Sequence, residues 1–250
     1  MDHTDQNDAI INPVKGKRTP NLGPLAIMVS SQTDLDELLK LTGLGEDYCR
    51  NLMMSRVYIG YESSRGFSLT GPVVGAPYGV MLMETLIVWG AQKIIFFGWC
   101  GAISPAVKTG DIIVPSGAVI DEGTSRHYNA DEKETAKPSS ALSEKIKAQL
   151  SKAGIDFHEG IVWSTDAIYR ETREKVRRFQ SDNVLAVEME MSALFTVGRF
   201  RNAEVAGILV VSDELSALKW QPGFKNERFG QSRAAVVEIL SRVGETHLAD

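Results

Sequence analysis

Short apolar runs alternate along the chain with longer segments whose apolar residues recur every three or four positions. The first pattern is typical of buried strands and the second of amphipathic helices. Strands are expected at residues 25–30, 56–61, 67–70, 93–97, 111–115, 117–120, 157–164, 183–187 and 205–212. Helices are expected at residues 34–41, 77–89, 140–153, 171–179, 190–200 and 231–243. The alternation predicts an α/β fold with a mixed central β-sheet flanked by helices.

One domain accounts for this pattern, because no repeat or linker interrupts it. The chain has 250 residues, which is enough for a single large α/β domain with a substantial core. Residues 1–23 contain Pro13 and Pro20 and are expected to form an irregular N-terminal arm, with the domain spanning residues 24–250.

Polar and glycine residues gather where several of the expected strands end. Gly98, Trp99, Cys100 and Gly101 follow the 93–97 strand and are expected to form a glycine-rich turn. The other ends lie at residues 164–169, 188–190 and 212–213. Ligands of α/β sheets bind beyond the carboxyl ends of the strands, so a binding site is expected where these segments meet.

Composition narrows the classes of function. Apolar residues make up 43% and charged residues 24%, as in ordinary globular proteins, and the net charge of −5 argues against a nucleic-acid partner. Cys49 and Cys100 are too few for a disulfide scaffold, and no metal-ligand spacing occurs. The polar N-terminus is unlike a secretory signal, and no apolar run approaches the 18 residues typical of a membrane span. A cytoplasmic location is expected, with no membrane partner and no metal.

Two carboxylates, Glu188 and Glu190, stand in the apolar run of residues 184–195. Burying a carboxylate costs on the order of several kcal/mol unless it is paired or hydrogen-bonded. Either at least one of the two faces a cavity and binds a ligand rich in hydroxyl or N–H donors, or they are structural groups that cap a loop or a helix start.

Several strand ends carry motifs that occur together in one family. The motifs span residues 97–104, 107–115, 121–128, 163–169, 187–194 and 209–215. In this order and spacing they resemble the nucleoside phosphorylase family of the hexameric or trimeric type, which includes purine nucleoside and uridine phosphorylases and methylthioadenosine nucleosidases. The resemblance covers roughly residues 55–245, and Gly-Asp-Ile-Ile-Val-Pro together with Val-Glu-Met-Glu carries most of it.

The resemblance implies roles at the ribose. Glu190 matches the family carboxylate that accepts hydrogen bonds from the 2′- and 3′-hydroxyls and opposes the positive charge that develops on the sugar. Met189 matches the thioether that packs against the ribose, although it could equally be a core residue. Glu188 points to the other side of an extended segment and is expected to be structural or to orient its neighbours.

The resemblance also implies how the base is held and released. Ser212-Asp213 resembles the purine-acting branch, in which the acid protonates or hydrogen-bonds N7 of the leaving base, whereas strictly pyrimidine-specific relatives lack an acid there. The alternative is that Asp213 caps the following loop. Asp166, Ile168 and Tyr169 lie in the segment that resembles the base pocket, where Ile168 replaces the usual stacking aromatic.

The expected phosphate site is missing from the sequence. The family uses a Gly-Asp-Pro turn followed by an arginine, a second arginine before the glycine-rich turn, and a Ser or Thr within it. Here residues 29–34 contain neither glycine nor arginine, and Phe96 and Trp99 occupy the other two positions. An aromatic side chain cannot replace the fork of an arginine on a phosphate. The phosphate-binding residues are therefore unknown.

Three interpretations of this departure stay open. In the first, other cations of the same or a neighbouring subunit bind the phosphate, and the candidates are Lys15, Lys17, Arg18, Arg56 and Arg65. The chain could be a hydrolase that uses water, or it could bind nucleosides without turnover.

The sequence thus predicts an enzyme that cleaves the N-glycosidic bond of a small-molecule nucleoside. A purine nucleoside is favoured and uridine is an alternative. Phosphorolysis is favoured over hydrolysis, with phosphate as co-substrate and no other cofactor. The resemblance further implies a homo-oligomer, either a dimer or a trimer of dimers.

Overall fold

One mixed β-sheet forms the centre of the computed structural model, which describes residues 9–17, 19–44, 48–59, 66–128 and 135–246. The strands are β1 (Leu25–Val29), β2 (Tyr48–Leu52), β3 (Ser55–Ile59), β4 (Phe67–Gly71), β5 (Lys93–Ala102), β6 (Ile112–Asp121), β7 (Thr135–Ala136), β8 (His158–Thr165), β9 (Ala186–Glu188), β10 (Glu204–Glu214) and β11 (Gln221–Pro222). The helices are α1 (Gln32–Thr42), α2 (Ala76–Val88), α3 (Ser140–Lys152), α4 (Arg173–Ser181), α5 (Met191–Phe200) and α6 (Glu227–Thr246), with 3₁₀ turns η1 (Ser125–Tyr128) and η2 (Ile168–Arg170). The predicted α/β class with a mixed sheet is confirmed.

Strand β5 is the centre of this sheet, because it pairs in parallel with β1 on one side and with β10 on the other. The pairs β10–β6, β6–β8, β8–β9 and β9–β5 then close a ring of strands. Beyond β1 the sheet continues as an open layer through β4, β3 and β2. The unbroken apolar stretch of residues 94–97 suits this central place, since both faces of β5 are covered and all four side chains are fully buried.

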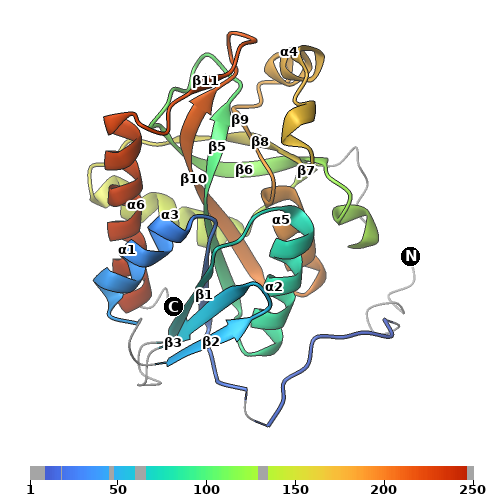
Figure 1. The fold of residues 1–250 in the computed structure, drawn as a ribbon, viewed down its shortest axis with the longest axis vertical. Helices are drawn as coiled ribbons and strands as arrows, with labels where there is room; N and C mark the ends of the chain where they lie inside the picture. The colour runs from blue at the N-terminus through green and yellow to red at the C-terminus, as the bar shows by residue number, and fades with distance from the viewer. Residues whose placement is uncertain (1–8, 18, 45–47, 60–65, 129–134, 247–250) are drawn as a thin grey trace.

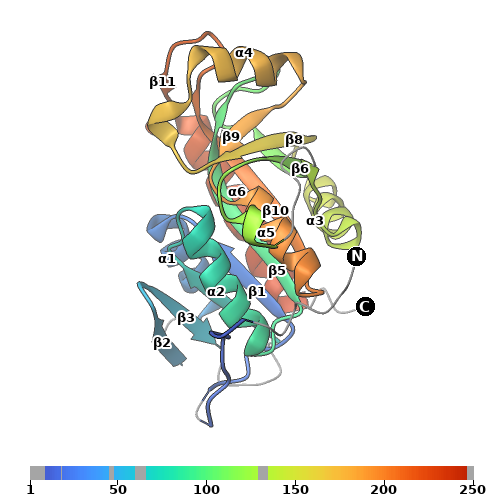
Figure 2. The same ribbon diagram turned by 90° about the vertical axis from the view of Figure 1, so that its right-hand side faces the viewer.

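Helices cover both faces of the sheet (Figure 1). Apolar side chains of α1, α3 and α6 join one buried cluster, and those of α2 and α5 join another on the opposite face. Helix α4 lies at the end of the molecule far from the β2–β3 hairpin, as Figure 2 shows. It covers Trp163 of β8, whose ring centroid is 4.5 Å from that of Phe179.

Pairing of the strands brings their ends together. Asp213 of β10 is in register with Gly101 of β5, and Gly101 is in register with Val187 of β9. Glu188, the next residue of β9, is in register with Ser164 of β8. Four segments that are far apart in the sequence therefore meet at one edge of the sheet, as expected for a ligand site in such a fold.

One expectation about local structure is wrong. The predicted turn is absent, because Gly98, Trp99, Cys100 and Gly101 belong to β5 and pair with β10, with one irregularity in register at Ser212. A Cβ atom at Gly98 would lie 2.5 Å from the Phe96 ring, and one at Gly101 would lie 2.7 Å from a Leu215 methyl group. These glycines admit neighbouring side chains rather than bending the chain.

Strand β2 was also not expected, because most of its residues are exposed and polar and so lack the pattern of a buried strand. The last residues of the expected 56–61 strand lie outside the described residues. The described residues 9–17 and 19–24 contain no helix or strand. The division into an arm over residues 1–23 and a domain over residues 24–250 remains a prediction. No helix in the described part of the chain is both long enough and apolar enough to span a membrane.

Two glycines, one in a tight contact and one in the open, test how closely α5 packs on β10. A Cβ atom at the buried Gly198 would overlap the Val205 side chain, whereas one at the exposed Gly230 of α6 would meet nothing within 4 Å. Overpacking a core costs about 1–3 kcal/mol, while alanine gains about 1 kcal/mol over glycine in an open helix. Urea unfolding should show Gly198→Ala less stable and Gly230→Ala slightly more stable than the wild type. Equal stability of both variants would contradict the tight α5–β10 contact.

Candidate active site

A cavity of about 660 Å³ lies at the edge of the sheet where β5, β8, β9 and β10 end. Its volume is within the usual range for small-molecule sites. The structure brings to it most of the residues singled out in the sequence. These are Trp99, Cys100, Gly101, Ile168, Tyr169, Glu188, Met189, Glu190, Ser212 and Asp213.

Asp166 and Gly98 are not among the residues that line the cavity. The carboxylate of Asp166 is exposed and accepts a hydrogen bond of 2.8 Å from the backbone N–H of Gly123. It ties together two loops, and its expected place in the base pocket stays a prediction. Gly98 lies earlier in β5 and packs beside Phe96.

Glu190 is buried at the N-cap position of α5, with 5% of its surface exposed. One carboxylate oxygen accepts a hydrogen bond of 2.5 Å from the N–H of Gly75, which precedes α2. The other oxygen accepts a longer bond of 3.3 Å from the N–H of Met189. The side chain is thus held between two helix starts while it lines the cavity, with capacity left to accept donors from a ligand.

Glu188 has structural contacts at the junction of β9 and α5. Its carboxylate accepts hydrogen bonds from the N–H groups of Glu190 (2.6 Å) and Met191 (2.7 Å) and from the hydroxyl of Ser164. The Ser164 oxygen in turn accepts a bond of 2.8 Å from the N–H of Ser192. Together the two side chains accept hydrogen bonds from three of the free N–H groups at the start of α5.

Burial makes both carboxylates weaker acids than usual. Burial is the main cause that raises the pKa of Glu190 above its ordinary value, and repulsion from the neighbouring Glu188 adds to it. The pKa of Glu188 is raised by burial too, against the opposing effect of its three hydrogen bonds. The charge of Glu122, another buried carboxylate, raises the pKa of Glu188 further.

Asp213 stands near the end of β10 with both carboxylate oxygens occupied. The hydroxyl of Ser212 donates to one oxygen at 2.6 Å, and the indole N–H of Trp220 donates to the other at 2.8 Å. Burial raises the pKa of Asp213, while these two donors act in the opposite direction. An aspartic acid with a raised pKa is better suited to deliver a proton near neutral pH.

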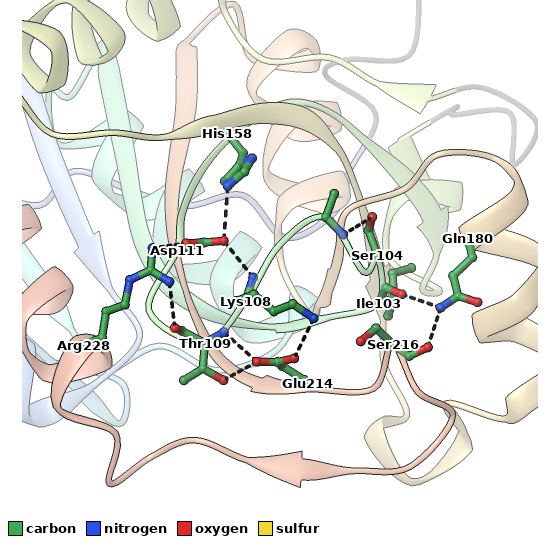
Figure 3. A network of polar contacts seen from close by, with 11 residues as sticks. Ile103, Ser104, Lys108, Thr109, Asp111, His158, Gln180, Glu214, Ser216 and Arg228 are labelled. Carbon is green, nitrogen blue, oxygen red and sulfur yellow. Dashed lines mark hydrogen bonds and ion pairs between the residues drawn. The ribbon is translucent and has the colours of Figure 1, made fainter.

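A polar network next to Asp213 fixes the surrounding loops, as Figure 3 shows. Glu214 accepts hydrogen bonds from the N–H and hydroxyl of Thr109 and lies 3.4 Å from the Lys108 ammonium. Gln180 of α4 donates to the carbonyls of Ile103 and Ser216. These bonds hold the segments that follow β5 and β10, and so hold the strand end that carries Asp213.

Aromatic side chains from the segment after β10 complete the apolar wall. Trp220 and Phe224 line the cavity together with Ile168 and Tyr169, and Phe224 lies 6.3 Å from the Trp99 ring. Sequence reasoning missed both Trp220 and Phe224. The available signal was two aromatic residues in a short polar segment that follows a strand end.

Trp99 is fixed by a buried ion pair behind the cavity wall. Its indole N–H donates to Asp34 at 2.8 Å, and Asp34 is only 2% exposed. The guanidinium of Arg233 binds the same carboxylate at 2.6 and 2.8 Å and lies over the Trp99 ring at 4.7 Å from its centroid. The charges of Asp34 and Arg233 therefore compensate one another. Phe96, at the expected arginine position, is completely buried.

The charged groups of the cavity wall are all acidic. They are Glu171, Glu188, Glu190 and Asp213, and among the described residues no lysine, arginine or histidine lines the cavity. Five other cations were candidates for binding phosphate. Lys15, Lys17 and Arg56 do not line the cavity, and Arg18 and Arg65 lie outside the described residues. Sequence reasoning missed Glu171, which follows η2.

A second hollow of about 670 Å³ is lined by residues that include Asp111, His158 and Arg228. Asp111 binds both of the other side chains, which uses part of their polar groups within the protein. Gly110, Asp111 and Ile112 of the Gly-Asp-Ile-Ile-Val-Pro motif line this hollow, but none of the residues assigned to the ribose or the base does. In the part of the chain that the structure describes, no group of three or more His, Cys, Asp or Glu side chains could hold a metal ion.

The family model of the phosphorylase superfamily matches residues 24–248, which is nearly the whole chain. The chain belongs to the phosphorylase superfamily. Guanosine phosphorylase of Halorubrum lacusprofundi is 28% identical over 193 residues, which are 77% of this chain and 79% of that protein. A DeoD-type purine nucleoside phosphorylase of Mycoplasma genitalium is 30% identical over 161 residues, 63% of this chain and 68% of the relative.

Solved structures of the superfamily have the same fold. Uridine phosphorylase from Vibrio fischeri matches with a TM-score of 0.72 and 26% identity, covering 88% of this chain and 92% of that one. Purine nucleoside phosphorylase from Toxoplasma gondii, solved in complex with immucillin-H, matches with a TM-score of 0.78 and 20% identity. That match covers 90% of this chain and 92% of the other, and it supports the fold alone.

Replacement of Glu190 tests the burial of its charge. A carboxyl group whose pKa is raised by folding contributes stability when protonated, below its ordinary pKa of about 4.5, and this contribution is lost as pH rises. Glu190→Gln should therefore unfold at a higher temperature than the wild type at pH 8, and the difference should shrink towards pH 5. Each kcal/mol corresponds to about 2–4 °C for a chain of this size.

Glu214→Gln is the matched control with the opposite sign. Hydrogen bonds from Thr109 and the charge of Lys108 lower the pKa of Glu214, so its ionised form stabilises the fold above its ordinary pKa. This variant should be less stable than the wild type at pH 8, with the difference vanishing as pH falls. A Glu190→Gln variant that also loses stability at pH 8 would contradict the assignment of a costly buried charge.

Proposed function

We propose that this protein cleaves the N-glycosidic bond of a nucleoside, with purine nucleosides favoured and uridine as the alternative. The observation that carries the proposal is that Glu190 and Asp213, the two groups that the resemblance assigns to the sugar and the base, line one cavity of ligand size. Membership of the phosphorylase superfamily supports the same class of reaction.

The ribose half of the site rests on Glu190. Backbone donors hold its carboxylate in place at the α5 start, so it is already oriented before a sugar arrives. In this proposal it accepts hydrogen bonds from the ribose hydroxyls. As the glycosidic bond breaks, the sugar gains oxocarbenium character, and the carboxylate opposes this positive charge. Met189 lines the same part of the wall and packs on the ribose.

The base half rests on Asp213. When the bond between the sugar and the base breaks, the bonding electrons move onto the base. Asp213 protonates or hydrogen-bonds N7 of a purine and so stabilises the leaving group. Ser212 positions the acid through its hydroxyl, while Ile168 and Tyr169 flank the base. Uracil has no equivalent of N7, which is why purines are favoured.

The acceptor of the ribosyl group has two candidates. Phosphate is the first, because the relatives are named as phosphorylases, and the products are then the free base and ribose 1-phosphate. Water is the second candidate, and a specific observation favours it. The described wall contains four carboxylates and no cation, and Arg233 is already neutralised by Asp34. A dianion would be repelled from such a wall.

Assembly into a dimer or a trimer of dimers and a cytoplasmic location remain predictions that belong to this proposal. Binding of a nucleoside without turnover also stays open as an alternative.

A substrate screen tests the proposal. Inosine, guanosine, adenosine and uridine are incubated with the full chain, with and without inorganic phosphate, and released base is measured by chromatography. We expect base release from purine nucleosides. Phosphorolysis requires a rate that increases with phosphate concentration until it saturates, whereas hydrolysis gives the same rate without phosphate. Absence of release from every nucleoside would contradict an enzymatic role and favour a binding protein.

Replacement of Asp213 tests whether this residue acts as the acid at N7 or only caps the following loop. Asp213→Asn should lower kcat/KM for inosine by about 10²–10⁴-fold, because the base then leaves without a proton donor. In 7-methylguanosine, N7 is methylated and the base is already cationic, so its cleavage needs no proton at N7. The variant should retain most of its activity on that substrate. An equal loss on both substrates would show that Asp213 is structural.

A further inference from the structure

The second hollow lies where α6 begins beside the first residues of β6 and β8. It shares no lining residue with the cavity of the candidate active site. Its volume of about 670 Å³ is within the range of small-molecule sites. Neither the ribose half nor the base half of the proposed reaction uses it, so its own side chains must indicate what it could bind.

Asp111 orients the two basic side chains of the second hollow, as Figure 3 shows. Its buried carboxylate accepts hydrogen bonds from the guanidinium of Arg228 and, at 2.7 Å, from the backbone N–H of Lys108. The same carboxylate lies 3.2 Å from Nε2 of His158. One buried acceptor thus fixes a side chain of α6 and a side chain of β8 at the wall of the hollow.

Both basic side chains keep polar atoms for a ligand. Among the described residues, Arg228 donates only to Asp111 and, at 3.5 Å, to the carbonyl of Thr109, so the rest of its N–H groups are left. An ionised carboxylate can only accept, so Nε2 of His158 carries a proton and Nδ1 is left. The side chain of Arg228 is 57% exposed and that of His158 is 41% exposed, so a ligand can reach both.

The charges of the second hollow differ from those of the active-site cavity. Arg228 compensates the charge of Asp111, and the other carboxylate of the wall, Asp156, is exposed, so that solvent and salt screen its repulsion. The cavity wall, in contrast, has four carboxylates and no cation among the described residues. An anion is therefore better accommodated in the second hollow than in the cavity.

We propose that the second hollow is a ligand site in which Arg228 and His158 bind the phosphate group of inorganic phosphate or of a small phosphate ester. The planar fork of an arginine matches phosphate oxygens, and Nδ1 of an imidazole can accept the O–H of a monoprotonated phosphate. The hollow is also lined by Ile155, Phe157 and Ala235, which give the organic part of an ester an apolar surface. Free phosphate and an ester share the charged half of this site, and the apolar half distinguishes them.

The experiment is titration calorimetry of the full chain with inorganic phosphate and with phenyl phosphate, in the wild type and in two variants of α6. Ala235 is half-buried and lines the second hollow, whereas the adjacent Ala234 is exposed and does not. Ala235→Glu adds a carboxylate to the hollow and should weaken binding of both anions at least about tenfold. Ala234→Glu makes the same change of charge on the same helix and should bind them as the wild type does.

Two further variants change the charges at the phosphate itself. Arg228→Gln removes charged hydrogen bonds and should weaken phosphate binding about 10- to 100-fold, while Arg228→Lys keeps the charge and should restore part of it. Asp156→Asn removes a repulsive charge and should tighten binding. Because Asp156 is exposed, this variant keeps the test valid if Arg228→Gln folds poorly.

The two anions identify the source of the phosphate group. Tighter binding of phenyl phosphate than of inorganic phosphate assigns the site to an ester whose organic part packs on Phe157 and Ile155. Equal or weaker binding of phenyl phosphate assigns the site to free phosphate. Either result supports the proposal, provided that Ala235→Glu abolishes the binding and Ala234→Glu does not.

Two results would overturn the inference. The first is that neither anion binds to the wild type. The second is that binding persists in Ala235→Glu and Arg228→Gln, which would place the anion elsewhere and favour phosphate as a co-substrate in the active-site cavity. The titrations contain no nucleoside, so a failure of the proposed cleavage reaction would leave their outcome unchanged.

Discussion

The site depends on how the chain satisfies the free N–H groups at the start of α5. Glu188 accepts two of them, and Ser164 of the neighbouring strand accepts a third. The buried carboxylate of Glu188 thus fixes the short β9–α5 junction. Because that junction is fixed, the side chain of Glu190 is held where it lines the cavity. The two carboxylates seen in the sequence therefore differ in place, since Glu188 holds the backbone of the junction and Glu190 lines the cavity with capacity left to accept donors.

Burial of so many carboxylates on one wall has an electrostatic consequence. Glu188 raises the pKa of Glu190, and Asp213 raises the pKa of Glu171, while among the described residues no cation of the wall offsets these charges. The cavity therefore suits neutral ligands with hydroxyl and N–H donors and disfavours anions. The Asp34–Arg233 pair adds to this, because it removes a guanidinium from use and holds Trp99 against the cavity.

Much of the fold was predictable from periodicity, because buried strands such as β1, β5 and β10 are continuous apolar runs and the helices are amphipathic. Two features of the fold were not predictable in this way. β2 lacks a buried pattern because it lies at an exposed edge, and the glycines after residue 97 indicated a turn although they serve close side-chain packing in β5. A glycine allows both outcomes, and only the neighbours in space decide between them.

Local patterns and ordered motifs in the sequence were enough to predict the class of fold, the family, and the ribose and base candidates Glu190 and Asp213. Tertiary structure decided what those residues face. It showed that Asp166 accepts a hydrogen bond from Gly123, that Trp220 donates one to Asp213, and that Glu171 lines the cavity. Contacts of this kind join residues from different elements, and their distances follow from strand register and loop packing, which a linear pattern does not contain.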